Sequence, residues 1–448
     1  MMSNKEKENS FLEIGTALAG GALTLFIGTG FSKYLTDNKA PSWLTLLNKC
    51  ARRLDKKIVR KLFDLDKQGR VTGCKFDLMI CAQILEDAYK REGKDIRQTI
   101  SNIVKNICKK KNINYSKLKK VKAFFHAYSR FNIITTNYDE LIQNLIPNSK
   151  VYIEGSGIPK TSDIKPIYHI HGSISNPSSL VLTQDDYFKF QHKETYISRK
   201  LFTVLQETTT VILGYSLQDF NLNRILNESK HTKDESKRSD IYYVSRTEID
   251  DLSKRYYFST FGIKVLDGIE IGDFFHDLDL EMSEATRIIK GAKRMPDILK
   301  GIKQFSDDFL KLGRSFVNIL LRIQAVGDRL NDVKVMELLI EVLERKKVFT
   351  AEPGAWSQYT HLAEWLIETG SLIDLTELPI KERYKNLVVY SFRTMSASQT
   401  FGKAWAAYDI WKNEIHRLTK KNKAMVKKII EGQFIYDSAR NLLPLIET

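Results

Sequence analysis

Three polar residues that could perform acid–base or hydrogen-bonding chemistry follow two apolar runs of this sequence. Asn137 and Asp139 come shortly after the run 131–135, and His171 ends the run 167–171 beside a glycine. A histidine placed there could act as a general base, because its pKa lies near neutrality and glycine lets a ligand approach closely. Taken singly, each residue has an ordinary structural explanation, which is helix capping for Asn137 and Asp139 and burial for His171.

The turn Gly28-Thr29-Gly30 also follows an apolar run, with Ser32 just beyond it. Glycines at such a turn let the backbone bend without a Cβ penalty and bring N–H groups near a ligand, as in sites for the pyrophosphate of a dinucleotide. A dehydrogenase fingerprint would need a third glycine at position 33 and an acidic residue after the next strand. Position 33 is Lys33, and no such strand follows at the expected distance. An ordinary dehydrogenase is therefore disfavoured.

A second glycine turn, Gly214-Tyr215-Ser216, follows the apolar run 210–213. Its backbone and hydroxyl could meet a phosphate or a ribose, and Thr136 adds a hydroxyl at the end of another run. Four expected strands thus end, one after another along the chain, in polar residues at the edge where a ligand would bind. Together they predict one shared binding site.

Apolar or β-branched runs separated by helical patterns predict the elements that position these residues. The expected strands are 23–27, 131–135, 167–171, 210–213, 241–244 and 263–266. The expected helices between them include 43–64, 76–89, 96–107 and 138–145. This alternation predicts an α/β fold with a parallel, Rossmann-like sheet, in which the carboxyl ends of the strands face one ligand crevice.

Beyond about residue 270 the pattern changes to amphipathic helices, as at 305–326 and 333–343. We therefore expect an all-helical C-terminal domain and place the two domains at residues 1–285 and 286–448. The apolar faces of its helices are expected to form a core or contacts between protomers. The basic clusters at 109–111 and 417–428 are expected to be solvated helix faces, with contact to nucleic acid or to an acidic partner as the alternative.

The 448 residues carry a formal net charge of +16, which favours contact with polyanions but names no partner. The four cysteines form no C-x-x-C pair, which argues against a zinc ribbon and a disulfide framework and predicts a cytoplasmic protein. The apolar stretch 14–27 is too short to span a bilayer, so no membrane association is expected. His169 and His171 would share one strand face, but further ligands are missing from any nearby motif, so no metal is expected.

Five motifs together resemble, in their order, those of the sirtuin-like (Sir2-like) NAD-binding domain over about residues 15–270. They are Gly28-Thr29-Gly30-Phe31-Ser32, Pro41-Ser42-Trp43, Thr135-Thr136-Asn137-Tyr138-Asp139, His171-Gly172-Ser173 and Gly214-Tyr215-Ser216. The segments 182–187 and 256–263 are similar to the bacterial branch that acts in antiphage defence. A deacetylase sirtuin carries a four-cysteine zinc ribbon after its His-Gly, whereas this chain has no cysteine after Cys108. The resemblance is therefore to a branch without the ribbon.

The resemblance implies roles for the residues that match its motifs, with NAD as the substrate. Asn137 would position water or ribose hydroxyls, Asp139 would orient the nicotinamide or the Asn137 loop, and His171 would be the general base. Contacts to phosphates or ribose would come from Gly28, Thr29, Gly30, Ser32, Thr136, Gly214 and Ser216.

The implied function is an NAD⁺ hydrolase effector of bacterial antiphage defence that releases nicotinamide and ADP-ribose and depletes NAD⁺ in an abortive infection. A zinc-free deacylase or ADP-ribosyltransferase, and a non-enzymatic sensor of an NAD derivative, remain alternatives. The helical domain is expected to gate the site through homo-oligomerisation or a partner. That partner would be a ring-forming DNA-translocase ATPase or a short Argonaute, which would bring the chain to nucleic acid indirectly. The sequence identifies neither partner nor trigger.

Overall fold

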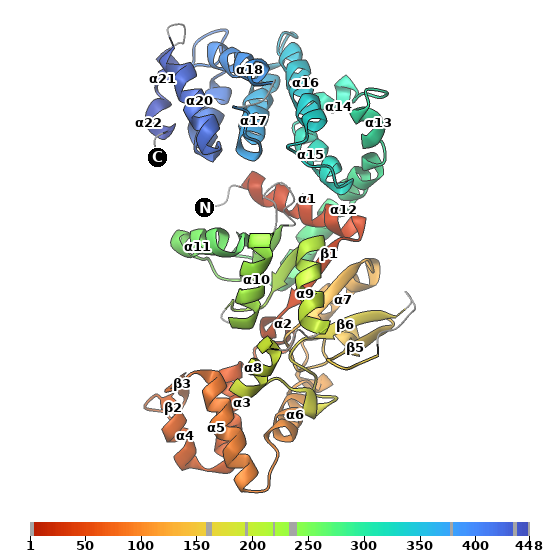
Figure 1. Ribbon diagram of the computed structural model, residues 1–448, viewed down its shortest axis with the longest axis vertical. Helices are drawn as coiled ribbons and strands as arrows, with labels where there is room; N and C mark the ends of the chain where they lie inside the picture. The colour runs from red at the N-terminus through yellow and green to blue at the C-terminus, as the bar shows by residue number, and fades with distance from the viewer. Residues whose placement is uncertain are drawn as a thin grey trace. The chain divides into compact units, whose positions relative to one another are not determined.

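The computed structural model describes residues 4–157, 164–192, 196–217, 220–232, 240–376, 380–432 and 437–446. The chain divides into two compact units, Met1–Thr286 and Arg287–Thr448. A seven-stranded sheet with helices on both faces builds the first unit, and helices build the second (Figure 1).

Seven parallel strands form the sheet of the first unit. In spatial order they are β5 (Ser149–Tyr152), β6 (Lys165–His169), β4 (Phe131–Thr135), β1 (Leu23–Ile27), β7 (Thr209–Leu213), β8 (Ile241–Val244) and β9 (Ile263–Leu266). Every neighbouring pair is parallel, and all five residues of β1 are buried. A continuous apolar strand is expected where both faces of a parallel sheet are covered. The predicted α/β fold with a Rossmann-like sheet is confirmed.

Successive residues of β1 point into different cores, one on each face of the sheet. Leu25 and Ile27 belong to the core on one face, and Phe26 belongs to the core on the other. The first face is covered by α1 (Asn4–Gly20), α2 (Thr29–Leu35), α7 (Tyr115–Ala127) and α12 (Ile271–Ala292). The second is covered by α9 (Tyr196–Glu207), α10 (Phe220–Thr232) and α11 (Asp251–Phe261).

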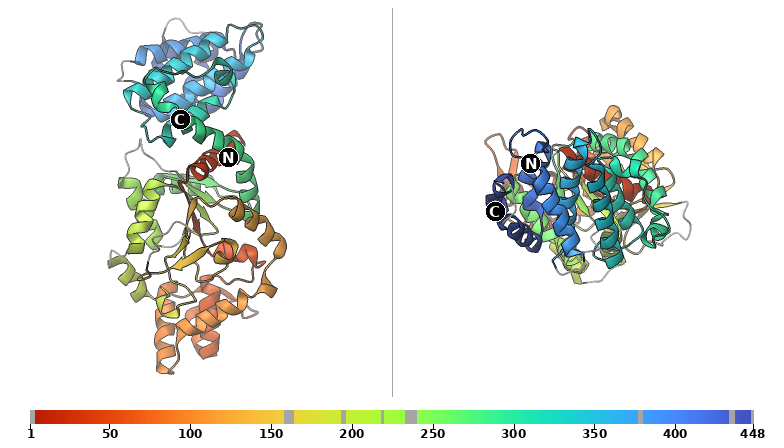
Figure 2. Two further views of the ribbon diagram at one scale, coloured as in Figure 1. Left: turned by 90° about the vertical axis from the view of Figure 1, so that its right-hand side faces the viewer. Right: turned by 90° about the horizontal axis from the view of Figure 1, so that it is seen from above.

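A helical insertion with its own apolar core separates α2 from α7 and lies beside one end of the sheet, orange in Figure 2. It consists of α3 (Trp43–Leu54), α4 (Lys56–Leu62), the hairpin β2 (Phe63–Leu65) and β3 (Val71–Cys74), α5 (Leu78–Arg91), α6 (Ile96–Ile107) and the 3₁₀ turn η1 (Lys110–Asn112). The helix expected at 43–64 is interrupted because Asp55 ends α3 and its carboxylate accepts from Lys57 N–H to cap α4. The hairpin also brings Cys74 to Cys81, with 3.0 Å between their Sγ atoms.

Two predicted elements that carry site residues differ from the structure. The helix expected at 138–145 is wrong, because these residues form turns and a short 3₁₀ helix, η2 (Gln143–Leu145). The side chain of Asp139 accepts from Leu141 N–H within this turn. The strand expected at 167–171 ends at His169, so His171 lies in the following turn. The edge strand β5 was not among the expected strands.

The strand order places a topological switch point next to β1. The chain passes from β1 to β4 and on to β6 on one side, and then returns to β7 on the other side. Ligands of open α/β sheets bind at the carboxyl ends of the strands where this reversal occurs. The turns after β1, β4, β6 and β7 therefore face one crevice.

The second unit contains helices around a single apolar core. They are α13 (Met295–Leu299), α14 (Asp307–Lys311), α15 (Ser315–Ala325), α16 (Val333–Phe349), α17 (Trp356–Leu372), α18 (Lys381–Thr394), α19 (Trp405–Glu414), η5 (Ile415–Arg417), α20 (Lys420–Glu431), α21 (Asp437–Arg440) and α22 (Leu443–Ile446). The predicted helical C-terminal region is confirmed, although the stretch 305–326 contains two helices rather than one. In the part of the chain that the structure describes, no helix combines the length and apolar character needed to cross a membrane.

Candidate active site

The two glycine turns after β1 and β7 interlock. The N–H of Gly30 donates to the carbonyl oxygen of Gly214 over 2.6 Å, and the N–H of Gly28 donates to that of Leu213 over 2.9 Å. A Cβ on Gly30 would lie 2.6 Å from the Cα of Gly214, closer than two carbons can approach. Gly214 itself has a φ of +64°, and a Cβ there would collide with the backbone of Phe31. These glycines are therefore required for the contact between the two turns as well as for access by a ligand.

Asn137 is buried behind the first glycine turn, and both hydrogens of its amide are used. Its Nδ2 donates to the carbonyl oxygen of Gly28 over 3.1 Å and to the hydroxyl of Ser32 over 3.0 Å. A carbonyl oxygen can only accept, so the amide must present its NH₂ group to Gly28. The Oδ1 atom of Asn137 is then left buried without a hydrogen-bond partner among the described residues. Leaving such an acceptor unpaired costs about 1–3 kcal/mol, so a ligand hydroxyl or water that reached Oδ1 would gain a stabilising hydrogen bond.

Ser32 and Asp139 support Asn137 from within the protein. The hydroxyl of Ser32 accepts from Asn137 and donates to Oδ2 of Asp139 over 2.7 Å. Burial raises the pKa of Asp139 above its ordinary value, while the bonds from Ser32 and from the N–H of Leu141 oppose that rise. Ser32 is buried, and its hydroxyl is engaged by Asn137 and Asp139; the phosphate contact predicted for it stays a prediction.

His171 is buried in the turn after β6, beside two aromatic rings. Its ring contacts that of Tyr187 edge-on at 5.5 Å between centroids, and Tyr187 stacks on Trp43 of α3 at 5.9 Å. Tyr187 lies in α8 (Gln184–His192), which follows the 3₁₀ turn η3 (Pro177–Ser179). The wall around His171 therefore combines the sheet with the helical insertion.

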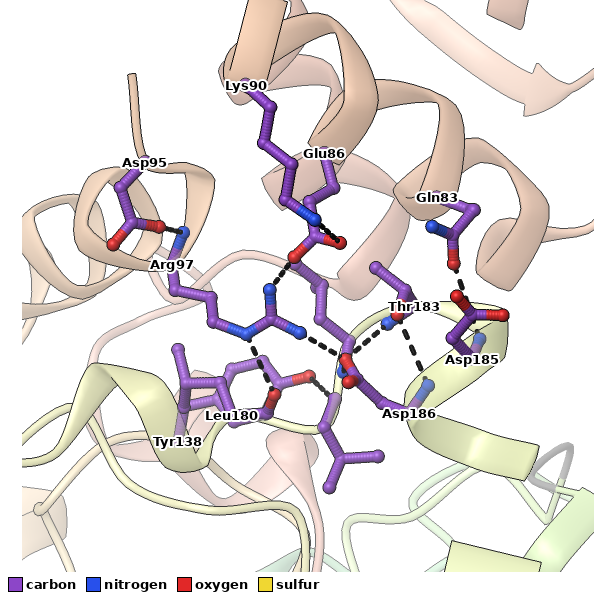
Figure 3. A network of polar contacts seen from close by, with 12 residues as sticks. Gln83, Glu86, Lys90, Asp95, Arg97, Tyr138, Leu180, Thr183, Asp185 and Asp186 are labelled. Atoms are coloured by element: carbon purple, nitrogen blue, oxygen red, sulfur yellow. Dashed lines mark hydrogen bonds and ion pairs between the residues drawn. The ribbon is translucent and has the colours of Figure 1, made fainter. Parts of the chain in front are cut away.

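An ion-pair network anchors the segment between His171 and Tyr187 to the insertion (Figure 3). Arg97 of α6 pairs with Glu86 of α5 and with Asp186 of α8. The carboxylate of Asp186 also accepts from the backbone N–H groups of Leu182 and Thr183, both over 3.0 Å. Asp186 belongs to the segment 182–187, whose resemblance to the bacterial branch carried no residue role. The structure shows it as an anchor for this segment.

One cavity of about 960 Å³ joins these parts, near the upper end of the usual range for small-molecule sites. Its wall includes eight of the ten predicted site residues: Thr29, Gly30, Thr136, Asn137, Asp139, His171, Gly214 and Ser216. Gly28 and Ser32 are not part of the wall, and both accept hydrogen bonds from Asn137.

Other residues of the wall were not predicted. The insertion supplies apolar side chains, among them Leu46, Leu78 and Met79. Cationic side chains come from Lys33, from Lys117 of α7 and from Arg246, which lies after β8. Lys33 had served only as the residue that breaks a dehydrogenase fingerprint, and nothing in the sequence around Arg246 marks it as part of a site.

His169 and His171 do not form a pair that is open to a metal ion. His169 is fully buried, with Nδ1 2.9 Å from the carbonyl oxygen of Asn137 and Nε2 2.8 Å from Nε2 of Gln143. Within the described ranges, no group of three or more His, Cys, Asp or Glu side chains is arranged to hold a metal ion. The roles predicted for the wall residues rest on their placement around the cavity.

Comparison with known proteins matches the part of the sheet from β4 to β9 to a family. Residues 132–266 match the SIR2-like domain. The chain is 22% identical to Defense-associated sirtuin 2 of Bacillus subtilis over 58% of this chain and 24% of that protein. It is 25% identical to the NAD(+) hydrolase ThsA of Bacillus cereus over 50% of this chain and 43% of that protein.

A third relative, the NAD(+) hydrolase ThsA of Enterococcus faecium, is 34% identical over 23% of each chain. This chain thus spans between about a quarter and less than half of the length of these curated relatives. The match covers β4 to β9 and includes the turns that carry Asn137, His171 and Gly214. The chain therefore contains a SIR2-like domain, and the sirtuin-like character inferred from its motifs is confirmed.

Proposed function

We propose that this chain is an NAD⁺ hydrolase that cleaves the nicotinamide N-glycosidic bond and serves bacterial antiphage defence by depleting NAD⁺. The observation that carries the proposal is that Asn137, whose buried Oδ1 has no hydrogen-bond partner among the described residues, and His171 line the same cavity. Relatives named as NAD(+) hydrolases and as a defence-associated sirtuin support it.

The reaction consumes NAD⁺ and water and yields nicotinamide, ADP-ribose and a proton. Breaking the C–N bond returns its electron pair to the cationic nicotinamide, which leaves as a neutral molecule, and the ribose becomes oxocarbenium-like. Oδ1 of Asn137 would accept from the attacking water or from a ribose hydroxyl and so hold it in place. His171 would accept the proton that the water loses.

The strand-end wall supplies groups suited to the rest of the substrate. A pyrophosphate needs hydrogen-bond donors and cations. The cavity wall offers the hydroxyls of Thr29 and Ser216 and the positive charges of Lys33 and Arg246. The N–H of Gly30 already donates to the Gly214 carbonyl oxygen, so it is not counted among the phosphate donors. The apolar residues of the insertion would surround the reacting end and exclude bulk water.

The decisive test incubates the purified chain with NAD⁺ and quantifies nicotinamide and ADP-ribose chromatographically. We expect Asn137→Ala and His171→Ala each to lower turnover at least about 100-fold with the fold retained. Asn132→Ala and His126→Ala are matched controls. Asn132 lies in β4, where its amide NH₂ donates to the hydroxyl of Thr24, and His126 is exposed on α7. Release that persists in both site variants would refute the proposed roles.

The same incubation separates the alternatives. An added acyl-lysine peptide would yield an acylated ADP-ribose product with a zinc-free deacylase, and an acceptor protein would become modified by an ADP-ribosyltransferase. A sensor would bind NAD⁺ without forming products. We also propose that the helical unit regulates the site through self-association or a partner such as a ring-forming DNA-translocase ATPase. The assay therefore includes arms with such an ATPase and with DNA, and inactivity of the wild-type chain in every arm would refute the hydrolase.

A further inference from the structure

His169 occupies a buried position directly behind the proposed site, where the proposed chemistry leaves it unused. It is the last residue of β6, and its side chain has no exposed surface. Burial lowers the pKa of His169 to about 4, so the ring is neutral at physiological pH. One nitrogen of a neutral ring donates and the other accepts.

The partners of the ring determine which nitrogen carries the proton. The carbonyl oxygen of Asn137 lies 2.9 Å from Nδ1 and can only accept, which favours the hydrogen on Nδ1; the backbone of Gly172 also interacts with the ring. Nε2 must then accept, and the side-chain NH₂ of Gln143 lies 2.8 Å away to donate to it. Gln143 thereby selects the tautomer that binds Asn137.

Asn137 is held by three further hydrogen bonds as well. Its N–H donates to Oγ1 of Thr135 over 3.0 Å, and its amide NH₂ donates to Gly28 and Ser32. The carbonyl bond from His169 completes the set, so that both backbone polar groups and both amide hydrogens of Asn137 are engaged. Of the polar atoms of Asn137, Oδ1 is the one without a hydrogen-bond partner among the described residues.

We propose that His169 is a positioning residue which, oriented by Gln143, holds the Asn137 backbone so that the Asn137 side chain stays aligned at the cavity wall. The inference rests on the proposed hydrolase function of Asn137. It gives a positioning role to His169 and Gln143, which both lie outside the cavity wall. A rigid supporting shell of this kind is what a precisely oriented catalytic group requires.

Three variants test the chain of bonds. His169→Phe removes the donor and fills the space, and we expect kcat to fall about 30-fold with KM changed less than about 3-fold. In His169→Asn the side-chain NH₂ can replace Nδ1, so kcat should recover to within about 5-fold of wild type. Gln143→Leu keeps the His169 ring but removes the group that donates to its Nε2, so either ring nitrogen can carry the hydrogen. We expect an intermediate loss of about 10-fold in kcat.

Tyr168→Phe is the matched control, because Tyr168 is buried on the same strand but belongs to the core on the opposite face. The unfolding temperature of every variant is measured alongside kcat. If His169→Asn is no more active than His169→Phe at equal stability, the donor at this position has no role and the inference is overturned. A similar loss in Tyr168→Phe would likewise overturn it.

The tautomer provides a measurement that needs no turnover. Long-range ¹H–¹⁵N spectra of histidine-labelled chain should show one of the eight histidines, identified by its loss in His169→Asn, with hydrogen on Nδ1 alone. Gln143→Leu should turn that signal into a mixture. A ring protonated at Nε2 in the wild-type chain would overturn the positioning role whatever the activity. A chain with the expected tautomer that releases no nicotinamide would instead contradict the proposed function alone.

Discussion

The two walls of the cavity are held in different ways. The strand-end wall is fixed by short bonds that involve the backbone, such as those from Asn137 to Gly28 and from Gly30 to Gly214. The wall formed by the insertion is fixed through side chains far apart in sequence, of which the contact of Arg97 with Asp186 is the main example (Figure 3). Backbone-coupled bonds tolerate little displacement, whereas a side-chain anchor lets a wall shift as a unit. We expect the first wall to control kcat and the second to control substrate affinity.

The largest effect is expected from Gly214→Ala. Its positive φ and the collision of the new Cβ with the Phe31 backbone should separate the two glycine turns and lower the free energy of unfolding by about 3 kcal/mol. Nicotinamide release should fall more than about 100-fold. Gly268→Ala is the matched control, because Gly268 also has a positive φ, +69°, but has open space around it. This variant therefore measures the cost of the left-handed backbone conformation alone, about 1 kcal/mol. Equal losses in both variants would show that contact between the turns is unimportant.

A smaller effect on the same wall is expected from Ser32→Ala. The change removes the hydroxyl that links the Asn137 amide to the buried Asp139 carboxylate, so kcat should fall about 10-fold while KM is retained. Ser10→Ala, which removes another buried hydroxyl that bonds only within α1, is the control for loss of a buried serine. A rise in KM with unchanged kcat would place Ser32 in substrate binding instead.

The second wall is tested by Arg97→Leu, which leaves Glu86 and Asp186 without their shared cation. Breaking a largely buried ion pair in this way should cost about 3 kcal/mol of unfolding free energy. We expect KM for NAD⁺ to rise about 5-fold with kcat nearly retained, because Tyr187 and the insertion shift together. In contrast, Arg70→Leu removes an exposed ion pair with Asp66. It should change neither the free energy of unfolding nor KM measurably. A fall in kcat as large as that in Ser32→Ala would erase the distinction between the walls.

The smallest effect at neutral pH concerns the stability supplied by neutral His169. Its folded pKa of about 4 lies below the unfolded value near 6.5, so the unfolded chain binds the proton more readily. The contribution is fully present above about pH 6.5 and is lost as the pH falls towards 4, by up to about 3 kcal/mol. Denaturant unfolding of wild type and His169→Asn should therefore converge or cross over that range. A constant difference would show that His169 is not buried in its neutral form.

Much of the first unit was predictable because its signals are local. Buried parallel strands read as continuous apolar runs, and polar residues after them mark the ligand edge of the sheet, which is how Asn137, His171 and Gly214 were found. The turn at 138–145 was mistaken for a helix because Asp139 and Glu140 are typical of a first helical turn. In the structure the Asp139 side chain accepts from Leu141 N–H within the turn and from the hydroxyl of Ser32. The bond with Ser32 is a tertiary contact, and it overrides the local preference for a helix.

The amino-acid sequence by itself determined the α/β order of elements, the helical character of the second unit and the strand ends where the site lies, since each depends on residue patterns a few positions long. Only the tertiary structure decided what those residues do for one another. It showed that Ser32 bonds to Asn137, that His169 bonds to the backbone of Asn137 and to Gln143, and that Arg97 pairs with Asp186 in the segment carrying Tyr187. These contacts join residues 26 to 105 positions apart, so no periodicity or motif reports them.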